Sequence, residues 1–462
     1  MLDDWLYSMS TPEDTMTTLS HGLILDDCIF KDNICSNGHG GAINGIVLSA
    51  RNCDFFDNRS ESSSASLECC GGAWALNIIP NNRESYPYVR DTTNTFINCR
   101  FERNHSSGFG GAFLTTAPCS LYFSDCTFDS NSANNDSPLF ARYNLTSPYS
   151  AFHRCTFINH TNLSVTSARS YNANVCLLTN LEKGEVFDCV VSNNYCNGTG
   201  ILTIGRNMII DRCVFANNVL GNDQSVALST GGRAAASARD YRIQGVIKTY
   251  TYNVQGNSRI RNSLFVSNRC ERTSGGAVAL CDTNNKSYWI ENNTFVGNGA
   301  AMRDEAVKAE FSSNSKYYSC ALFVHITNHN GIDAMRINNN LFHGNYDLDN
   351  PAAVQDIYCP YTKDTTQGRA VVSNCFFSVK ATRGDIMANG TQNCVVGFDP
   401  KFVAADKGDW RIKSSSKASK SGLVLDWMEN AYDLAGKSRM DEGYVAIGCY
   451  QPAFSGCSII IR

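Results

Sequence analysis

The strongest constraint on the fold is a phrase that recurs from near the start of the chain almost to its end. A typical copy is Ile290-Glu291-Asn292-Asn293-Thr294-Phe295-Val296-Gly297-Asn298. With its Phe as position zero, a copy has an apolar residue at −5, Asn or Asp near −4 or −3, often Cys at −2 and usually Asn at +3. Position zero is filled eleven times, by Phe30, Phe55, Phe101, Phe128, Phe157, Val191, Phe215, Phe265, Phe295, Phe342 and Phe377. Because each copy needs the same surroundings as the last, the pattern predicts a stack of similar coils.

The spacing within a copy predicts where each coil bends. Positions −5 and −2 are an odd number apart, so a continuous strand would place them on opposite faces. Both appear buried, which indicates a corner between them, at Glu291-Asn292 in the typical copy. Asn at +3 marks a second corner, where it tolerates left-handed φ and its amide can stack along the axis. The shortest intervals favour three short strands per coil, and the longest hold either an additional degenerate coil or a loop.

Charge and hydropathy narrow the classes of partner. The net charge is −4 and only 18% of the residues are charged, so nothing indicates a nucleic acid or an anionic membrane as partner. No apolar run approaches the roughly 20 residues that a transmembrane helix needs. The first residues, Met1-Leu2-Asp3-Asp4-Trp5, lack the basic start and apolar core of a signal peptide.

Many of the 21 cysteines share position −2 of the repeat. They are Cys28, Cys53, Cys99, Cys126, Cys155, Cys189, Cys213 and Cys375. Equivalent residues in stacked strands lie about 4.8 Å apart, whereas the Cβ atoms of a relaxed disulfide lie about 3.8 Å apart. We therefore expect mostly free, buried thiols in this column. We expect one disulfide, between Cys449 and Cys457.

A second recurring phrase carries a family resemblance. Gly40-Gly41-Ala42, Gly71-Gly72-Ala73, Gly110-Gly111-Ala112 and Gly275-Gly276-Ala277 follow the Asn corner. The pairing of G-G-A-[ILVFW] with F-x-x-N over roughly residues 25–380 resembles the polymorphic outer-membrane proteins of chlamydiae. The resemblance implies a right-handed parallel β-helix, a surface or secreted location and adhesion. It does not extend to a membrane-translocating barrel.

The tail resembles the closing segment of bacterial secreted β-helix proteins of the choice-of-anchor type. The matching phrases are Asp399-Pro400-Lys401-Phe402, Gly408-Asp409-Trp410-Arg411-Ile412, Asp433-Leu434-Ala435-Gly436 with Arg439, and Ala446-Ile447-Gly448-Cys449-Tyr450. The resemblance implies a C-terminal cap and carries over no binding site. We therefore expect an all-β, right-handed parallel β-helix with protruding loops, divided into a lead-in or N-terminal cap (1–22), repeats (23–395) and a closing segment (396–462).

One pair of motifs looks catalytic but has a simpler explanation. Asp26-Asp27-Cys28 and Gly38-His39-Gly40 resemble pieces of the polygalacturonase-type glycosidases, which need paired carboxylates. His39 follows Asp27 by only half a coil, whereas stacking the two on one face requires about a full coil. The repeat explains both pieces, as a corner and as a strand entry. We therefore interpret them as structural.

The candidate ligand-binding residues lie in the longest repeat interval. If Ile243 and Ile247 face inward, then one outer face carries Arg242, Gln244, Lys248, Tyr250 and Tyr252. Aromatic rings stack on sugars, and Arg or Lys pairs with uronate or sulfate, so the stripe suits an acidic glycan. In a lyase, Lys248 or an Arg could abstract the proton beside the carboxylate. The alternative is a solvated face with Tyr chosen for its β-propensity.

Metal ligands are not evident in the sequence. It contains no D-x-D-x-D-G loop and no nonapeptide calcium repeat, and His325 and His329 lack a metal-ligand frame. We expect no cofactor and no structural zinc, and carboxylate-rich corners leave calcium open.

The leading hypothesis for function is an extracellular or cell-surface protein that binds polysaccharides or host-surface glycans without catalysis. One alternative is a polysaccharide lyase or glycoside hydrolase acting on acidic polysaccharide, and a second is a structural spike or fibre. The sequence leaves open which glycan is bound and the oligomeric state.

Overall fold

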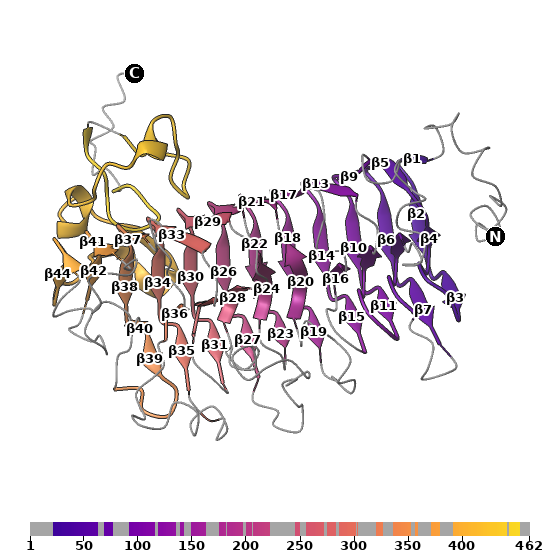
Figure 1. The fold of residues 1–462 in the computed structure, drawn as a ribbon, viewed down its shortest axis with the longest axis horizontal. Helices are drawn as coiled ribbons and strands as arrows, with labels where there is room; N and C mark the ends of the chain where they lie inside the picture. Colours follow the sequence, from indigo (N-terminus) through magenta and orange to yellow (C-terminus); the bar gives the residue numbers. More distant parts are fainter. Residues whose placement is uncertain are drawn as a thin grey trace, which may run out of the picture.

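The computed structural model is a solenoid of parallel strands, so the expected all-β parallel β-helix is confirmed. Its coils stack along the long axis from β1 to β44, with the closing segment gathered at the C-terminal end (Figure 1). The residues that the structure describes are 22–62, 69–76, 92–115, 119–134, 139–142, 149–162, 175–181, 183–196, 200–205, 207–221, 245–249, 256–271, 275–282, 286–301, 303, 320–326, 336–352, 356–358, 371–378, 391–440 and 443–452.

Sheets A and B each contain twelve of the described strands, in chain order. Sheet A consists of β1 (Leu23–Asp26), β5 (Val47–Arg51), β9 (Thr93–Ile97), β13 (Ser120–Ser124), β17 (Ser150–His153), β21 (Gly184–Phe187), β25 (Met208–Asp211), β29 (Gly256–Arg261), β33 (Lys286–Glu291), β37 (Arg336–Asn338), β41 (Val371–Ser373) and β43 (Thr391–Gln392). Sheet B consists of β2 (Ile29–Lys31), β6 (Asp54–Phe56), β10 (Arg100–Glu102), β14 (Thr127–Asp129), β18 (Thr156–Ile158), β22 (Val190–Ser192), β26 (Val214–Ala216), β30 (Leu264–Val266), β34 (Thr294–Val296), β38 (Leu341–His343), β42 (Phe376–Phe377) and β44 (Val395–Val396).

Sheets C and D each contain ten described strands. Sheet C consists of β3 (Ile34–Ser36), β7 (Arg59–Glu61), β11 (His105–Ser106), β15 (Ser132–Ala133), β19 (Thr161–Asn162), β23 (Tyr195–Cys196), β27 (Val219–Leu220), β31 (Arg269–Cys270), β35 (Gly299–Ala300) and β39 (Tyr346–Asp347). Sheet D consists of β4 (Ile43–Asn44), β8 (Trp74–Leu76), β12 (Phe113–Thr115), β16 (Phe140–Arg142), β20 (Val175–Leu181), β24 (Gly200–Ile204), β28 (Gly245–Thr249), β32 (Val278–Asp282), β36 (Leu322–Ile326) and β40 (Ile357–Tyr358).

A complete coil therefore has four strands, and the expectation of three was wrong. The error arose because several strands are only two or three residues long, so a fourth fits between the corners of even the shortest repeat. Across the long intervals the described strands still pair with their direct neighbours: β6 pairs with β10, and β26 with β30. Among the described strands, no additional coil lies between these pairs.

The repeat phrase is in register through the whole of sheet B. All eleven predicted zero positions pair in sequence, and Val396 adds a twelfth beside Phe377. The rings of Phe55 and Phe101 stack with centroids 4.7 Å apart, and successive pairs repeat this contact along the axis. Burial of these rings supplies much of the apolar driving force for the fold.

The first corner lies where the spacing predicts it. The residue at −3 has left-handed φ in coil after coil, for example +52° at Asn52 and +54° at Asn292. The second corner was misplaced by one residue, because the left-handed residue is at +2, such as Asp57 (φ +53°) and Ser267 (φ +55°). Asn at +3 instead turns its side chain inward and is buried. In the second corner, therefore, the residue at +2 makes the bend and the Asn at +3 forms the hydrogen bonds.

The +3 asparagines form a buried amide ladder, as expected. Asn104 Oδ1 accepts from the backbone N–H of Asn58 (3.0 Å) and from its Nδ2 (2.9 Å), while Asn104 Nδ2 donates to the carbonyl of Phe55 (2.9 Å). The pattern continues to Asn131, is interrupted by His160, and resumes from Asn194 to Asn345. The ladder satisfies polar groups that would be costly to bury unpaired.

The cysteines at position −2 of the repeat pack their thiols in the core. Cys53, Cys99, Cys155 and Cys213 are free and fully or almost fully buried, which confirms the expectation of free thiols for these residues. The predicted bridge between Cys449 and Cys457 was wrong, because Cys449 is a buried free thiol. Its expected partner lies outside the described residues.

The paired glycines let neighbouring coils approach closely. Gly40 has φ +71°, and a Cβ on Gly41 would lie 2.1 Å from the carbonyl oxygen of Gly72 in the next coil. Only glycine fits such a contact.

The closing segment packs against the side of the last coils. It contains β45 (Phe402–Ala404), β46 (Asp409–Ile412) and the 3₁₀ helices η3 (Ala405–Lys407), η4 (Lys417–Lys420) and η5 (Asp426–Met428). Ile412, Ala418 and Ile447 pack on the outward side chains of Leu341 and Phe376 in sheet B. The cap that the tail resemblance implied is thus, in the described residues, a lateral cover.

Two residues of the tail motif hold this cover in place. Asp433 accepts hydrogen bonds from the backbone of Ala435, Lys437 and Gln451, which folds the segment on itself. Arg439 Nε donates to Asn262 Oδ1 at 2.7 Å, which ties the segment to the corner before β30. Among the helices of the described ranges, none has the length and apolarity to cross a bilayer.

Candidate functional site

The stripe predicted from the sequence falls largely outside the described residues. Arg242, Gln244, Tyr250 and Tyr252 lie there, so their arrangement stays a prediction. The backbone of Lys248 lies in β28, between Thr203 of β24 and Ala279 of β32. The interval thus rejoins the solenoid in sheet D.

The polygalacturonase-like pieces lie on different parts of the coil. Asp27 forms the left-handed corner between β1 and β2, with φ +49°. His39 lies between β3 and β4, at the strand entry that Gly40 makes. This placement agrees with the structural interpretation.

Charged and aromatic side chains from several coils converge on the outer face of sheet A. They occupy positions −6 and −4, on either side of the inward residue at −5. The −6 positions of three consecutive strands are Arg259, Trp289 and Arg336, which the parallel pairing aligns. At −4 the same strands carry Arg261, Glu291 and Asn338.

Trp289 is held between two arginines. The guanidinium carbon of Arg259 lies 4.0 Å from the ring centroid of Trp289, and that of Arg336 lies 4.7 Å from it. Such stacking contributes about 0.5–2 kcal/mol per pair and fixes the guanidinium planes. The indole N–H of Trp289 is buried and has no hydrogen-bond partner in the described structure. An unpaired buried donor costs free energy, so Trp289 stabilises the cluster by the stacking of its ring and not by a hydrogen bond.

A second tryptophan reaches the cluster from the closing segment. Trp427, in η5, stacks under Arg261 at 4.6 Å and donates its indole N–H to Glu291 Oε2 at 2.7 Å. Arg261 Nε also donates to Asp211 Oδ2 at 2.9 Å. The site is therefore completed by a residue 136 positions beyond Glu291, from outside the repeat.

Positive charge is in excess within this arginine–tryptophan cluster, which we define as Arg259, Arg261, Arg336, Trp289, Trp427, Glu291 and Asp211. Burial raises the pKa of Glu291, against the opposing effect of Trp427 and the arginines. Burial, with repulsion from Arg261 and Arg336, lowers the pKa of Arg259 despite the attraction of Glu291. The mutual repulsion of Arg259, Arg261 and Arg336 marks a place where another cation is unfavourable and an anion would be stabilised.

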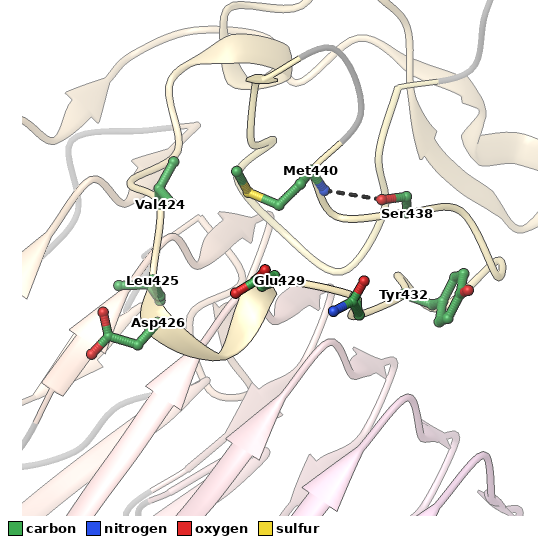
Figure 2. A pocket seen from close by; sticks show the side chains of 8 residues that line it. Val424, Leu425, Asp426, Glu429, Tyr432, Ser438 and Met440 are labelled. Carbon is green, nitrogen blue, oxygen red and sulfur yellow. Dashed lines mark hydrogen bonds between the residues drawn. The ribbon is translucent and has the colours of Figure 1, made fainter.

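A pocket of about 570 Å³ opens beside the cluster, on the closing segment. Figure 2 shows its lining residues, which are Val424, Leu425, Asp426, Glu429, Asn430, Tyr432, Ser438 and Met440. Asp426 and Glu429 bring two carboxylates to it, so the pocket would repel an anion. We therefore treat it as separate from the arginine–tryptophan cluster, although η5 contributes to both.

The sequence interpretation missed this cluster, although part of the signal was present. Reading the positions flanking −5 across the last coils would have aligned Arg259, Trp289 and Arg336. Trp427 carries no such signal, because its segment lies outside the repeat. Among the described residues, no group of His, Cys, Asp or Glu side chains is arranged to hold a metal ion.

Comparison of the chain with models of known protein families and with curated proteins found no match.

Proposed function

We propose that the protein is a surface-displayed or secreted binding protein for anionic polysaccharides. The ligand lies along the outer face of sheet A and its carboxylate or sulfate groups pair with the arginine–tryptophan cluster. The observation that carries this proposal is the stacking of Arg259 and Arg336 on the two sides of Trp289. Guanidinium groups held in this way lose little further freedom on binding, and each can form two parallel hydrogen bonds to a carboxylate.

Two further features support the proposal. The whole chain has a net charge of −4, so the local excess of cations is a property of this face rather than of the composition. The G-G-A and F-x-x-N phrases resemble those of chlamydial surface proteins, which supports display outside the cell and adhesion. The tail phrases resemble those of secreted β-helix proteins, which supports a location outside the cell.

Binding of polygalacturonate to the full chain tests the proposal, with its fully methyl-esterified form as the uncharged control. We expect binding of the acid form, little binding of the ester, and weakening at high salt. Arg259→Gln and Arg336→Gln should each weaken binding about 10-fold, since each removes a charged hydrogen bond.

Arg154→Gln is the matched control, because Arg154 is an exposed arginine already paired with Asp125 at 2.6 Å. It should change binding less than twofold. Equal binding of the acid and the ester, or equal effects of the three substitutions, would refute the proposal.

A further inference from the structure

A second group of polar side chains lies on the same outer face, nearer the N-terminus. Tyr122, His153 and Glu185 come from β13, β17 and β21, three consecutive strands of sheet A. His153 Nε2 lies 2.8 Å from Glu185 Oε1, and His153 Nδ1 lies 3.4 Å from the hydroxyl of Tyr122. The three side chains thus form a line of carboxylate, imidazole and phenol.

The packing around the imidazole fixes its plane. The ring of His153 is stacked on Phe187 with centroids 5.4 Å apart and planes at 7°, and it meets the ring of Tyr122 edge-on at 79°. Ala151 pairs in register with Tyr122 on one side and with Glu185 on the other. Because its side chain is small, the imidazole of His153 has room to lie between the phenol and the carboxylate. The side chains of His153 and Glu185 are 19% and 22% exposed, so solvent and ligand reach them.

The partners determine which nitrogen carries the proton. Next to a carboxylate, Nε2 donates, so Nδ1 of the neutral ring accepts from the Tyr122 hydroxyl. The phenol oxygen then has its lone pairs free on the side away from the imidazole. This is the arrangement of a reactive hydroxyl, a base that takes its proton, and a carboxylate that holds the base.

We propose that Tyr122 is the catalytic base of a β-elimination that cleaves uronate-containing polysaccharides, with His153 and Glu185 as the residues that position and activate it. The inference rests on the proposed function, because the arginine–tryptophan cluster would hold the adjoining sugar units on the same face. Arg212, whose guanidinium lies 5.8 Å from the ring centroid of Phe187, borders the relay and pairs with both Asp188 and Asp211.

The step is balanced without any added reagent. Tyr122 Oη takes the proton from the carbon that bears the sugar carboxylate, while the phenol proton passes to His153 Nδ1. The electron pair of the broken C–H bond forms the carbon–carbon double bond, and the bond to the leaving glycosidic oxygen breaks. The imidazolium, stabilised by Glu185, returns the proton through Tyr122 to that oxygen. The products are a new reducing end and an unsaturated uronate.

The test is incubation of the full chain with polygalacturonate, alginate and hyaluronate, monitored by the ultraviolet absorbance of unsaturated ends and by separate binding measurements. We expect product from at least one polymer that the chain binds. Tyr122→Phe should lower the rate about 100-fold or more, with affinity within twofold of the wild type. Glu185→Gln should lower the rate with affinity unchanged, because the imidazole loses the carboxylate that orients it, and Glu185→Asp should restore part of the rate. Tyr195→Phe, on sheet C, should leave rate and affinity unchanged.

The outcomes separate the two proposals. Binding without unsaturated product, product without unsaturation, or full activity of Tyr122→Phe would overturn the catalytic proposal and leave the binding proposal standing. Absence of binding to all three polymers would overturn both.

Discussion

The corner between sheets A and B has the same backbone in both halves of the solenoid but differs in how far its side chains are exposed. In the N-terminal half, Arg154 (φ +52°) sits at −3 and pairs with Asp125 in the preceding coil, and their side chains are 56% and 42% exposed. In the C-terminal half the same position is Asn262, Asn292 and Asn339, all fully buried.

The closing segment explains the difference. Asn292 Nδ2 donates to the carbonyl of Ala446 at 2.9 Å, and Asn339 both donates to and accepts from Leu423. An asparagine can tolerate left-handed φ, donate and accept without burying a charge, whereas an arginine or aspartate under the cover would need a buried counter-ion. The repeat therefore specifies the bend: exposed corners accept Asn, Asp or Arg, as at Asn52, Asp125 and Arg154, whereas the three corners under the cover are all Asn.

The two halves of the amide ladder should differ most in their dependence on pH, through Asp356. This buried carboxyl accepts from Asn345 Nδ2 at 2.9 Å, and its Oδ2 has no partner in the described structure. Burial raises its pKa from 3.8 to about 7. Since the folded state holds the proton more tightly, stability falls as pH rises from about 4 to about 7, by on the order of 4 kcal/mol. Asp356→Asn should abolish this loss in urea unfolding at several pH values. Parallel curves for the two proteins would contradict it.

His160 should give the N-terminal half the opposite dependence. Its Nδ1 accepts from the backbone of Asn131 at 3.1 Å, and its buried Nε2 has no partner among the described residues. Burial lowers its pKa from 6.5 to about 4. Stability is therefore present above about 6.5 and is lost as pH falls towards 4, by about 3 kcal/mol. His160→Asn should remove this acid sensitivity, as monitored by amide exchange in β14, β18 and β22. Unchanged acid sensitivity would contradict this account.

Arg439 should be the main attachment of the closing segment. Its Nε bonds to Asn262 Oδ1 and its second amino group bonds to the carbonyl of Gly448 at 2.9 Å. Arg439→Met leaves both acceptors buried without a partner, so we expect a loss of about 3 kcal/mol and fast exchange of residues 396–452. Arg411→Met is the control, because Arg411 is half exposed beside Asp409 and should cost under about 1 kcal/mol. Equal losses would show that the attachment lies elsewhere.

Asn292→Ala and Asn52→Ala compare the same corner position with and without the cover. Both lose the residue that favours left-handed φ, which costs about 1 kcal/mol in each. Only Asn292 also loses the bond to Ala446, so its variant should be about 2 kcal/mol less stable than that of the exposed Asn52. Thermal unfolding measures the difference. If the two variants are equally stable, the cover adds nothing to the stabilisation that asparagine gives at this corner.

Arg154→Gln should have the smallest effect. Its pair with Asp125 is exposed to solvent, although hydrogen bonds from Arg154 and Ser124 lower the pKa of Asp125 to about 2. We expect a loss below about 1 kcal/mol in thermal unfolding, shrinking further in high salt. A loss as large as that of Asn292→Ala would erase the distinction between exposed and covered corners.

Much of the fold could be predicted because every coil carries its own copy of the repeat. The apolar −5 residue, the bend before Phe, the buried thiols and the amide ladder all follow from a pattern that neighbouring copies reinforce. The count of strands per coil failed, since a two-residue strand such as His105–Ser106 has too few residues to show alternation. The +2 bend failed because several residue types fill it, while the conspicuous Asn beside it performs a different task.

The candidate site could be predicted only in part. Arg259, Trp289 and Arg336 share one repeat position, so their alignment was available from the sequence. The relay of Tyr122, His153 and Glu185 was harder to see, because its members come from two columns and meet only through side-chain direction.

The sequence by itself determined the coil, because its local bends and inward residues depend on contacts with the adjacent copy. Only the tertiary structure decided where the closing segment lies. Arg439 meets Asn262 across 177 positions. That contact depends on how far all the intervening coils advance along the axis and on which corner the segment returns to, and neither is encoded in any single repeat. The same placement of the closing segment brings Trp427 to the arginine–tryptophan cluster and completes it.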